Sequence, residues 1–598
     1  MIPARTFLSL TVSALLAGTF VTGTVLLGGC SSDETIIEKR ESVVTDPVSF
    51  DVQGLSGALQ ENVQAHLNAI PPISKRRVFI FRRELRESVE TALRAYGYYH
   101  PVIDITLPER EKEDDRRVRI SVDHGKPIYV RYCNVEILGE GADYRVFKTL
   151  LDDAGLNSYS VLNHQAYEKL KSDLNATALS LGFFDAQYIS SRIMVYADQN
   201  VADIELVYDT GKRYHFGEII ADDSTRELMQ PVSSLMTLNE GRKFSTRVIN
   251  DYSNSLNQTG FYRSVDVRPL LDEVKDYSVP VEISLERKSN NIMRLGAGYS
   301  TDEGPRVLFE WEKPLLNAAG HSLTTKAQIS AITQDASIVY KIPRNDPNLD
   351  YYYINASQTH TDLNDTVSDR SHLSFHYVAN DTGRWRRDYA LKAEYEDYEQ
   401  GADVGYGWNL MPSLLLSRRE TTGGFDPRFG YSLNLDFSGA SDVISDYSFV
   451  RFLGTFRSVL SPSENTRLVT RVQQGAIFGP DSTNLPPSLR FFAGGDNSIR
   501  GYGYLDESPR NSGGLNGARY LTTGSVEFQF PCGIDSSRLA LFLDGGTATD
   551  DYRDDILWGP GFGYRYISQY GTVRVDLGFA MDHDPVDVHL HVAFGPEF

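Results

Sequence analysis

The sequence is poor in cysteine and methionine, and it holds only one long apolar run. Of its 598 residues, 3 are Cys and 7 are Met. Cys133 and Cys532 belong to different segments, so we expect free thiols and no disulfide framework. Beyond the N-terminal run, no stretch approaches the roughly 18 consecutive apolar residues of a membrane-spanning helix. A mature chain that crosses a membrane must therefore cross it as a closed β-barrel, which satisfies its own backbone hydrogen bonds in lipid.

An excess of positive charge and the common catalytic motifs are also missing. The formal net charge of −21 disfavours nucleic acid or anionic lipid as the main partner. No metal-binding His-Glu-x-x-His, Gly-x-Ser-x-Gly or phosphate-binding P-loop pattern occurs. Gly559–Gly563 mimics part of a dinucleotide-binding loop but lacks its strand-to-helix context. His589 and His591 share a strand face without an evident third metal ligand, which favours a polar lumen face. We expect no enzyme, no cofactor and no metal.

The N-terminus has the pattern of an export signal. Arg5 precedes an uncharged apolar run that ends at Gly29, and Cys30 follows directly. This pattern predicts a secretory signal peptide over residues 1–29. The small residues before Cys30 resemble a bacterial lipoprotein cleavage box, so we expect lipid on Cys30 to anchor the mature chain. A plain signal peptide and an uncleaved anchor are the alternatives.

Three segments repeat one pattern, in which helix-spaced apolar residues lead to a glycine and two aromatic residues. The glycines are Gly97, Gly182 and Gly260, spaced 85 and 78 residues apart. Each is expected to close a helix in the left-handed conformation. Strand-like runs precede and follow each helical stretch. After a linker over 30–47, the sequence therefore predicts three strand–helices–strand–strand units over 48–127, 128–213 and 214–288.

From about residue 289 the helical spacing gives way to alternation of apolar and polar residues. Val573–Phe579 and Val586–Phe594 show it most clearly. A soluble β-sandwich would alternate similarly, but runs of about 9–11 residues suit tilted membrane strands. The 310 residues from 289 to 598, at roughly 19 for each strand and loop, give about 16 strands. The expected fold is thus α+β repeats followed by an all-β transmembrane barrel of antiparallel strands.

A loop and several strands resemble one known family. Phe491–Tyr502 is similar to the signature loop of the BamA/TamA superfamily of outer-membrane insertases and transporters, and the repeats resemble its polypeptide-transport-associated (POTRA) domains. The number of three repeats resembles the TamA branch, although the lipoprotein box is more similar to lipidated TamL-like relatives. Other segments that carry the resemblance are Pro427–Gly430, Leu541–Gly546, Gly559–Arg565, Gly298–Arg306 and Phe594–Phe598.

The resemblance implies a role for the loop. In the family, the arginine that matches Arg500 pairs with carboxylates on the inner barrel wall, and these match Glu527 and Asp544 here. Such pairing would lock the loop, with Gly501 and Tyr502, inside the barrel. Without the resemblance, an ordinary surface loop with a solvated arginine is the favoured interpretation, because an enclosed arginine needs carboxylate partners.

The resemblance also implies function and partners. It places the barrel in the bacterial outer membrane and the POTRA domains in the periplasm. The partners that it implies are client outer-membrane proteins such as autotransporters and a TamB-like protein anchored in the inner membrane. Gly296 and Gly298 should weaken the first barrel strand. We expect it to pair poorly with the last strand, around Leu590 and Val592, and to offer a seam to client strands. A pore that conducts polypeptide or lipid through its lumen is the alternative.

Overall fold

The computed structural model describes most of the chain after the predicted linker. The described residues are 49–70, 78–107, 117–380, 384–422, 426–463, 466–511, 514–534, 536–553, 555–568 and 571–595. The predicted signal peptide and the whole of the predicted linker, Cys30 included, lie outside them, so export and lipidation stay predictions. Within these residues, no helix has the length and apolar character needed to cross a membrane. Cys133 and Cys532 are free thiols, as predicted.

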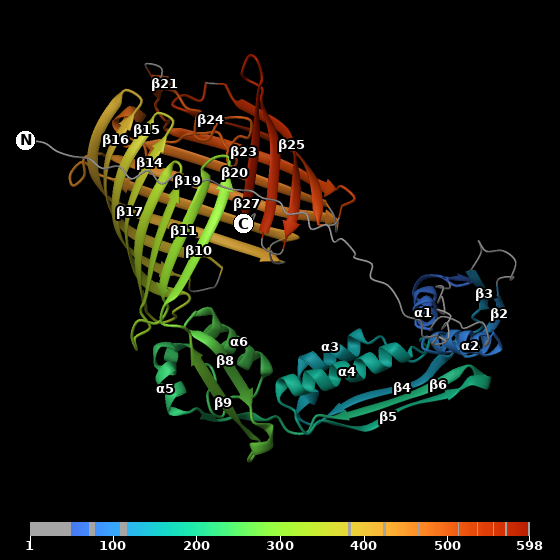
Figure 1. The fold of residues 1–598 in the computed structure, drawn as a ribbon. Helices are drawn as coiled ribbons and strands as arrows, with labels where there is room; N and C mark the ends of the chain where they lie inside the picture. The colour runs from blue at the N-terminus through green and yellow to red at the C-terminus, as the bar shows by residue number, and fades with distance from the viewer. Residues whose placement is uncertain are drawn as a thin grey trace, which may run out of the picture. The chain divides into compact units, whose positions relative to one another are not determined.

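Three αβ units precede the barrel, each a three-stranded sheet covered by helices (Figure 1). In every unit the last strand lies in the middle of the sheet, in the orders β1-β3-β2, β4-β6-β5 and β7-β9-β8. The predicted order of strand, helices, strand and strand is confirmed. The elements are β1 (Ser49–Gln53), α1 (Gly57–Asn68), α2 (Val78–Arg94), β2 (Val102–Thr106) and β3 (Arg117–Asp123); β4 (Tyr129–Leu138), α3 (Arg145–Asp153), α4 (His164–Leu181), β5 (Gln187–Tyr196) and β6 (Val201–Asp209); and β7 (His215–Ile220), α5 (Asp223–Met229), α6 (Thr246–Gln258), β8 (Tyr262–Pro269) and β9 (Ser278–Arg287).

The repeated glycines close the long helices as their positions predict. Gly97, Gly182 and Gly260 have φ angles of +84°, +85° and +71°, a region that side chains with a Cβ rarely adopt. At Gly182 a Cβ would also lie 2.7 Å from the side chain of Phe244. The following aromatic residue then enters the core, and Phe183 is fully buried.

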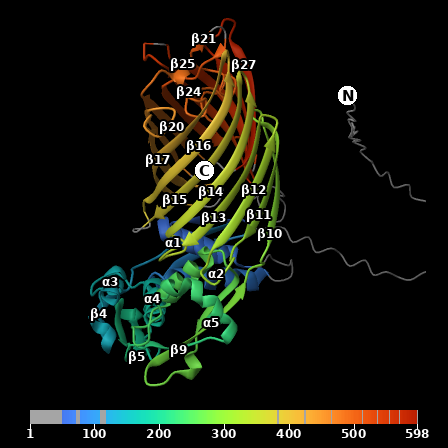
Figure 2. The same cartoon turned by 90° about the vertical axis from the view of Figure 1, so that its left-hand side faces the viewer.

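The remaining long strands form a closed barrel of 16 antiparallel strands, each paired with its neighbour in the chain. Figure 2 shows that these strands are inclined to the barrel axis, as a closed barrel requires. Their number confirms the prediction. The strands are β10 (Ile292–Ser300), β11 (Gly304–Lys313), β12 (Ser322–Ser330), β13 (Thr333–Pro343), β14 (Asp350–Leu363), β15 (Thr366–Ala379), β16 (Arg386–Gln400), β17 (Asp403–Thr422), β18 (Phe429–Ala440), β19 (Phe449–Ser463), β20 (Thr466–Phe478), β23 (Tyr520–Pro531), β24 (Ser537–Thr549), β25 (Leu557–Ser568), β26 (Gly571–Ala580) and β27 (Asp587–Gly595).

The expected strand length is right for some strands and wrong for others. β10 has 9 residues, but β17 has 20. At about 3.3 Å per residue, a strand as long as β17 exceeds a hydrocarbon core about 30 Å thick even when it is tilted. The longer strands must therefore continue beyond the membrane.

The barrel wall is apolar outside and polar inside. On β24, Leu539, Leu541 and Leu543 are 41 %, 55 % and 48 % exposed, whereas Asp544 is fully buried. A soluble sandwich would bury the apolar face of such a strand, but lipid takes that place around a membrane barrel. The distribution therefore favours the membrane barrel.

Candidate functional site: the lumen loop and the barrel seam

The connection between β20 and β23 folds against the inner wall of the barrel. Ile499 and Tyr502 are fully buried and Arg500 is only 4 % exposed. The wall strands approach this loop at glycines: a Cβ on Gly559 of β25 would lie 2.0 Å from the Arg500 carbonyl oxygen, and one on Gly578 of β26 would lie 2.5 Å from the Gly501 nitrogen. The interpretation of a solvated surface loop is therefore wrong, because the loop backbone packs directly on the wall.

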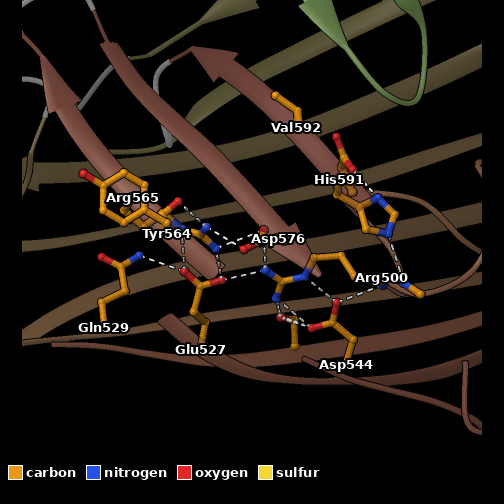
Figure 3. Close-up of polar contacts among 12 residues, drawn as sticks. Arg500, Glu527, Gln529, Asp544, Tyr564, Arg565, Asp576, His591 and Val592 are labelled. Carbon is orange, nitrogen blue, oxygen red and sulfur yellow. Dashed lines mark hydrogen bonds and ion pairs between the residues drawn. The ribbon is translucent and has the colours of Figure 1, made fainter. Parts of the chain in front are cut away.

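The structure brings Arg500 together with both carboxylates that the resemblance indicated (Figure 3). Its Nε donates to Asp544 Oδ2 at 2.8 Å, its Nη2 to Asp544 Oδ1 at 2.9 Å and its Nη1 to Glu527 Oε2 at 2.7 Å. The guanidinium also lies 3.4 Å from the ring centroid of Phe542. Such a two-pronged contact with Asp544 fixes orientation as well as charge.

Two residues that the sequence did not single out complete this cluster. Asp576 on β26 accepts from Arg500 Nη1 at 3.1 Å, and Arg565 on β25 pairs with both Asp576 and Glu527 at 2.6 and 2.8 Å. In the sequence, Asp576 stands at a polar position of an alternating run, so an inward-facing charge could have been read from the pattern. The pairing of Asp576 with the loop could not have been read from the sequence, because the two residues lie 76 positions apart and meet only in the folded barrel.

The charges of the cluster balance. Arg471 on β20 lies 3.8 Å from Asp544, so three arginines (Arg471, Arg500 and Arg565) face three carboxylates (Glu527, Asp544 and Asp576). All three carboxylates are less than a tenth exposed. Buried charges are tolerated when they are paired and hydrogen-bonded, and this network joins the loop to β20, β23, β24, β25 and β26.

Gly501 and Tyr502 extend the contacts of the loop toward the last strands. Gly501 has a φ of +101°, and a Cβ there would lie 2.7 Å from the Phe579 backbone. The Tyr502 hydroxyl donates to Asp582 Oδ2 at 2.7 Å and lies 3.1 Å from the Trp558 carbonyl oxygen. Both predicted loop residues thus contact the wall.

The seam between the first and last strands is much shorter than the other junctions. β10 pairs with β11 at nine positions, and β27 pairs with β26 at nine positions. Within the part of the chain that the structure describes, β10 and β27 pair only through Ser300 and Ala593. Thr301 adds two hydrogen bonds of 3.1 Å to the backbone of Val592.

The predicted seam residues flank this short junction. Gly296 and Gly298 lie on β10 and pair with β11, Leu590 lies on β27 with its side chain 56 % exposed, and Val592 takes part in the junction itself. Among the described residues, the two glycines have no partner on β27. Up to Gly595, where the described residues end, β10 before Ser300 therefore has no strand pairing with β27.

Side chains and the loop bridge the seam. His591 Nδ1 lies 2.6 Å from Asp496 Oδ1, and the Gly501 N–H donates to His591 Nε2 at 3.0 Å. On the other side, the Asp496 N–H donates at 2.9 Å to Asp302, in the turn between β10 and β11. The loop thus holds both edges of the seam. The sequence analysis did not single out Asp302 and Asp496, although both lie in segments that carry the family resemblance, because nothing in the sequence indicates that these segments meet.

These bridging groups suit hydrogen bonds better than a metal ion. Ligand atoms of Asp302, Asp496 and His591 lie within 4.8 Å of one another. Since Gly501 N–H donates to Nε2, the ring hydrogen is assigned to Nδ1, where it points at Asp496. A metal bound at Nδ1 would require the ring hydrogen to lie on Nε2, where it would point at the Gly501 N–H, and two donors would then face each other. His589, with its ring centroid 6.2 Å from that of His591, stands outside this group.

Comparisons with known proteins agree with this architecture. Residues 287–598 match the model of the Omp85 superfamily domain, and residues 49–124 match that of POTRA domain TamA domain 1. The outer membrane protein assembly factor BamA of Nitratidesulfovibrio vulgaris is 24 % identical over 560 residues, which cover 88 % of this chain and 70 % of that protein.

A solved structure shares the fold. The crystal structure of BamA from Haemophilus ducreyi lacking POTRA domains 1–3 superimposes with a TM-score of 0.53 at 14 % identity, covering 91 % of this chain and 98 % of that chain. CdiB from Acinetobacter baumannii gives a TM-score of 0.44 at 12 % identity, with coverages of 90 % and 98 %. The predicted superfamily is confirmed, whereas the TamA branch stays a prediction. With that family's domain over more than half of its length, this chain belongs to the Omp85 superfamily of outer-membrane assembly and secretion factors.

Proposed function

We propose that this protein inserts or secretes client outer-membrane proteins, autotransporters among them, at the seam between β10 and β27. The observation that carries the proposal is the short junction between these strands, which within the described residues pair only at Ser300 and Ala593. An open strand edge pairs readily with another chain, which is a hazard in most proteins. In an insertase the same edge accepts a client strand by β-augmentation.

The loop on the inner wall favours insertion at the seam rather than conduction through a pore. A conducting pore would have to displace the loop, whose Arg500 is bound to three carboxylates. Opening the seam requires the loss of the Ser300–Ala593 pair, the hydrogen bonds of Thr301 and the bridges through Asp302 and His591. Breaking these few contacts disturbs far less structure than displacing the loop from the inner wall of the barrel.

We further propose that the chain is a TamA-type protein whose three αβ units are POTRA domains in the periplasm. Their sheet edges would engage clients or a periplasm-spanning, TamB-like partner. In the second unit, the edge strands β4 and β5 expose Tyr132 (57 %) and Ile189 (60 %), which gives a β-strand partner both backbone groups and apolar side chains. Deleting residues 48–213 should leave a folded barrel that has lost assembly activity. Normal activity of that truncation would make these units spacers.

A reversible lock across the seam tests the proposal. Ser300→Cys with Ala593→Cys, in a background without Cys133 and Cys532, should form a crosslink and block assembly of a client barrel in proteoliposomes. Reduction should restore assembly. Phe309→Cys with Ala327→Cys joins β11 to β12 within the wall and serves as the matched control, because it leaves the seam free. Full assembly with the seam locked would support conduction through the lumen instead.

A further inference from the structure

The lumen wall also forms a cavity whose described charged lining residues are all arginines. This cavity, of about 540 Å³, is lined by Arg384, Arg386, Arg419 and Arg457 and otherwise by hydroxyl and amide side chains of β17 to β19 and of the connection between β15 and β16. Its described lining residues include no aspartate or glutamate. The chain as a whole has 80 acidic against 59 basic residues, so this concentration of arginine runs against its composition.

The strand register places two of the lumen arginines directly opposite each other. Arg457 on β19 is paired with Arg471 on β20, and like charges in such positions destabilise a sheet. Arg471 is compensated, since it donates to the loop carbonyls of Asp496 and Ser498 and lies near Asp544. Arg457 faces a second repulsive charge, that of Arg574 on β26.

Neighbouring carboxylates compensate the positive charge of the cavity's arginines only in part. Arg386 lies 3.4 Å from Asp388, and Arg384 interacts electrostatically with Glu420. The Nε atom of Arg574 is buried without a hydrogen-bond partner among the described residues. Arginine cannot escape such a position by losing its proton. The arrangement therefore lowers the stability of the empty barrel and favours an anion in the cavity.

We propose that this cavity binds a ligand that carries two phosphate groups. The planar guanidinium matches phosphate oxygens in pairs, and the hydroxyl and amide groups of the lining supply further donors. At neutral pH two phosphates carry about −2 when both are diesters and roughly −3 to −4 when both are monoesters. Two of the four arginines lie near Asp388 and Glu420, so either charge compensates the remaining positive charge. An acidic peptide would need several carboxylates to converge in the same small volume. The phosphates can belong to a lipid headgroup or to a small soluble molecule.

Binding to the purified full-length chain tests the site. The two probes are free pyrophosphate, and cardiolipin in phosphatidylcholine nanodiscs, whose headgroup has two phosphates. The test variant is Arg419→Gln with Arg457→Gln. Arg418→Gln is the matched control, because it removes a charge from the adjacent position of β17, where Arg418 pairs with Glu420. We expect at least one probe to bind the wild type and the control, and the double variant to bind it at least 10-fold more weakly.

The outcomes separate the sources of phosphate. Binding of pyrophosphate indicates a soluble ligand, and binding of cardiolipin alone indicates a lipid headgroup; each supports the site. The unliganded double variant should also unfold at a higher temperature than the wild type, because mutual repulsion is relieved. Binding of neither probe, or equal losses in Arg418→Gln, overturns the proposal, and tighter binding of polyglutamate overturns the choice of phosphate. None of these results depends on client insertion, which is measured separately.

Discussion

Replacing Arg500 with alanine removes the side chain that joins the loop to three strands of the wall. Its guanidinium donates to Glu527 on β23, Asp544 on β24 and Asp576 on β26. The substitution leaves three buried carboxylates facing two arginines. Removal of one member of a buried ion pair costs about 3–5 kcal/mol, since the remaining charge stays in a poorly solvated place.

The surrounding contacts place Arg500→Ala at the lower end of that range. Glu527 and Asp576 keep Arg565, so Asp544 is the carboxylate that loses its main partner. Asp544 retains the Ser525 hydroxyl at 2.6 Å. We therefore expect a loss of about 3 kcal/mol in the free energy of unfolding. Arg500→Lys should lose about half as much, because lysine keeps the charge but lacks the planar fork.

Urea unfolding in detergent micelles measures this loss, and limited proteolysis reports whether the loop has left the wall. Asp544→Asn completes a double-mutant cycle with Arg500→Ala, for which we expect a coupling energy of about 1–3 kcal/mol. A loss below about 1 kcal/mol, with the loop still protected, is the behaviour of a solvated surface pair. That result would refute the locking role of Arg500.

Three further predictions concern separate contacts. His591→Phe should free the loop from β27 and speed its proteolysis, whereas His589→Phe should not; equal effects would argue against the bridge at the seam. Gly578→Ala should displace the loop, because the new Cβ would lie 2.5 Å from the Gly501 nitrogen. If Arg500→Ala then lowered the free energy of unfolding as much in the Gly578→Ala background as in the wild type, the loop would not have been displaced. Burial raises the pKa of the Cys133 thiol, so at pH 8 iodoacetamide should modify it more slowly than a free cysteine, as mass spectrometry would show.

Local patterns in the sequence predicted the fold well. Helical spacing that ends at Gly97, Gly182 and Gly260 located three helices and their closing turns, because these signals lie within one stretch of chain. Alternation located a few of the barrel strands, such as β26 and β27, and chain length gave their number. Neither predicted the length of β17 (Asp403–Thr422), where Pro412 and three consecutive leucines interrupt the pattern.

The site was only partly predictable. Residue chemistry alone favoured a solvated Arg500, and the pairing with Glu527 and Asp544 came from the family resemblance. Asp576 was visible as an inward polar position, yet its partner depends on how a loop crosses the lumen. Asp302 contacts Asp496, 194 residues later in the chain, and no periodicity reports such a distant contact.

Trapping a client strand at the seam tests the central claim most directly. Single cysteines at Leu295 on β10, Ile338 in the middle of the wall and Thr359 in the lumen would be combined with cysteines along the last strand of an arrested client barrel. The account predicts disulfides at Leu295 in one defined register, and none at Ile338 or Thr359. Disulfides at Thr359 without any at Leu295 would contradict it, because the client would then pass through the lumen.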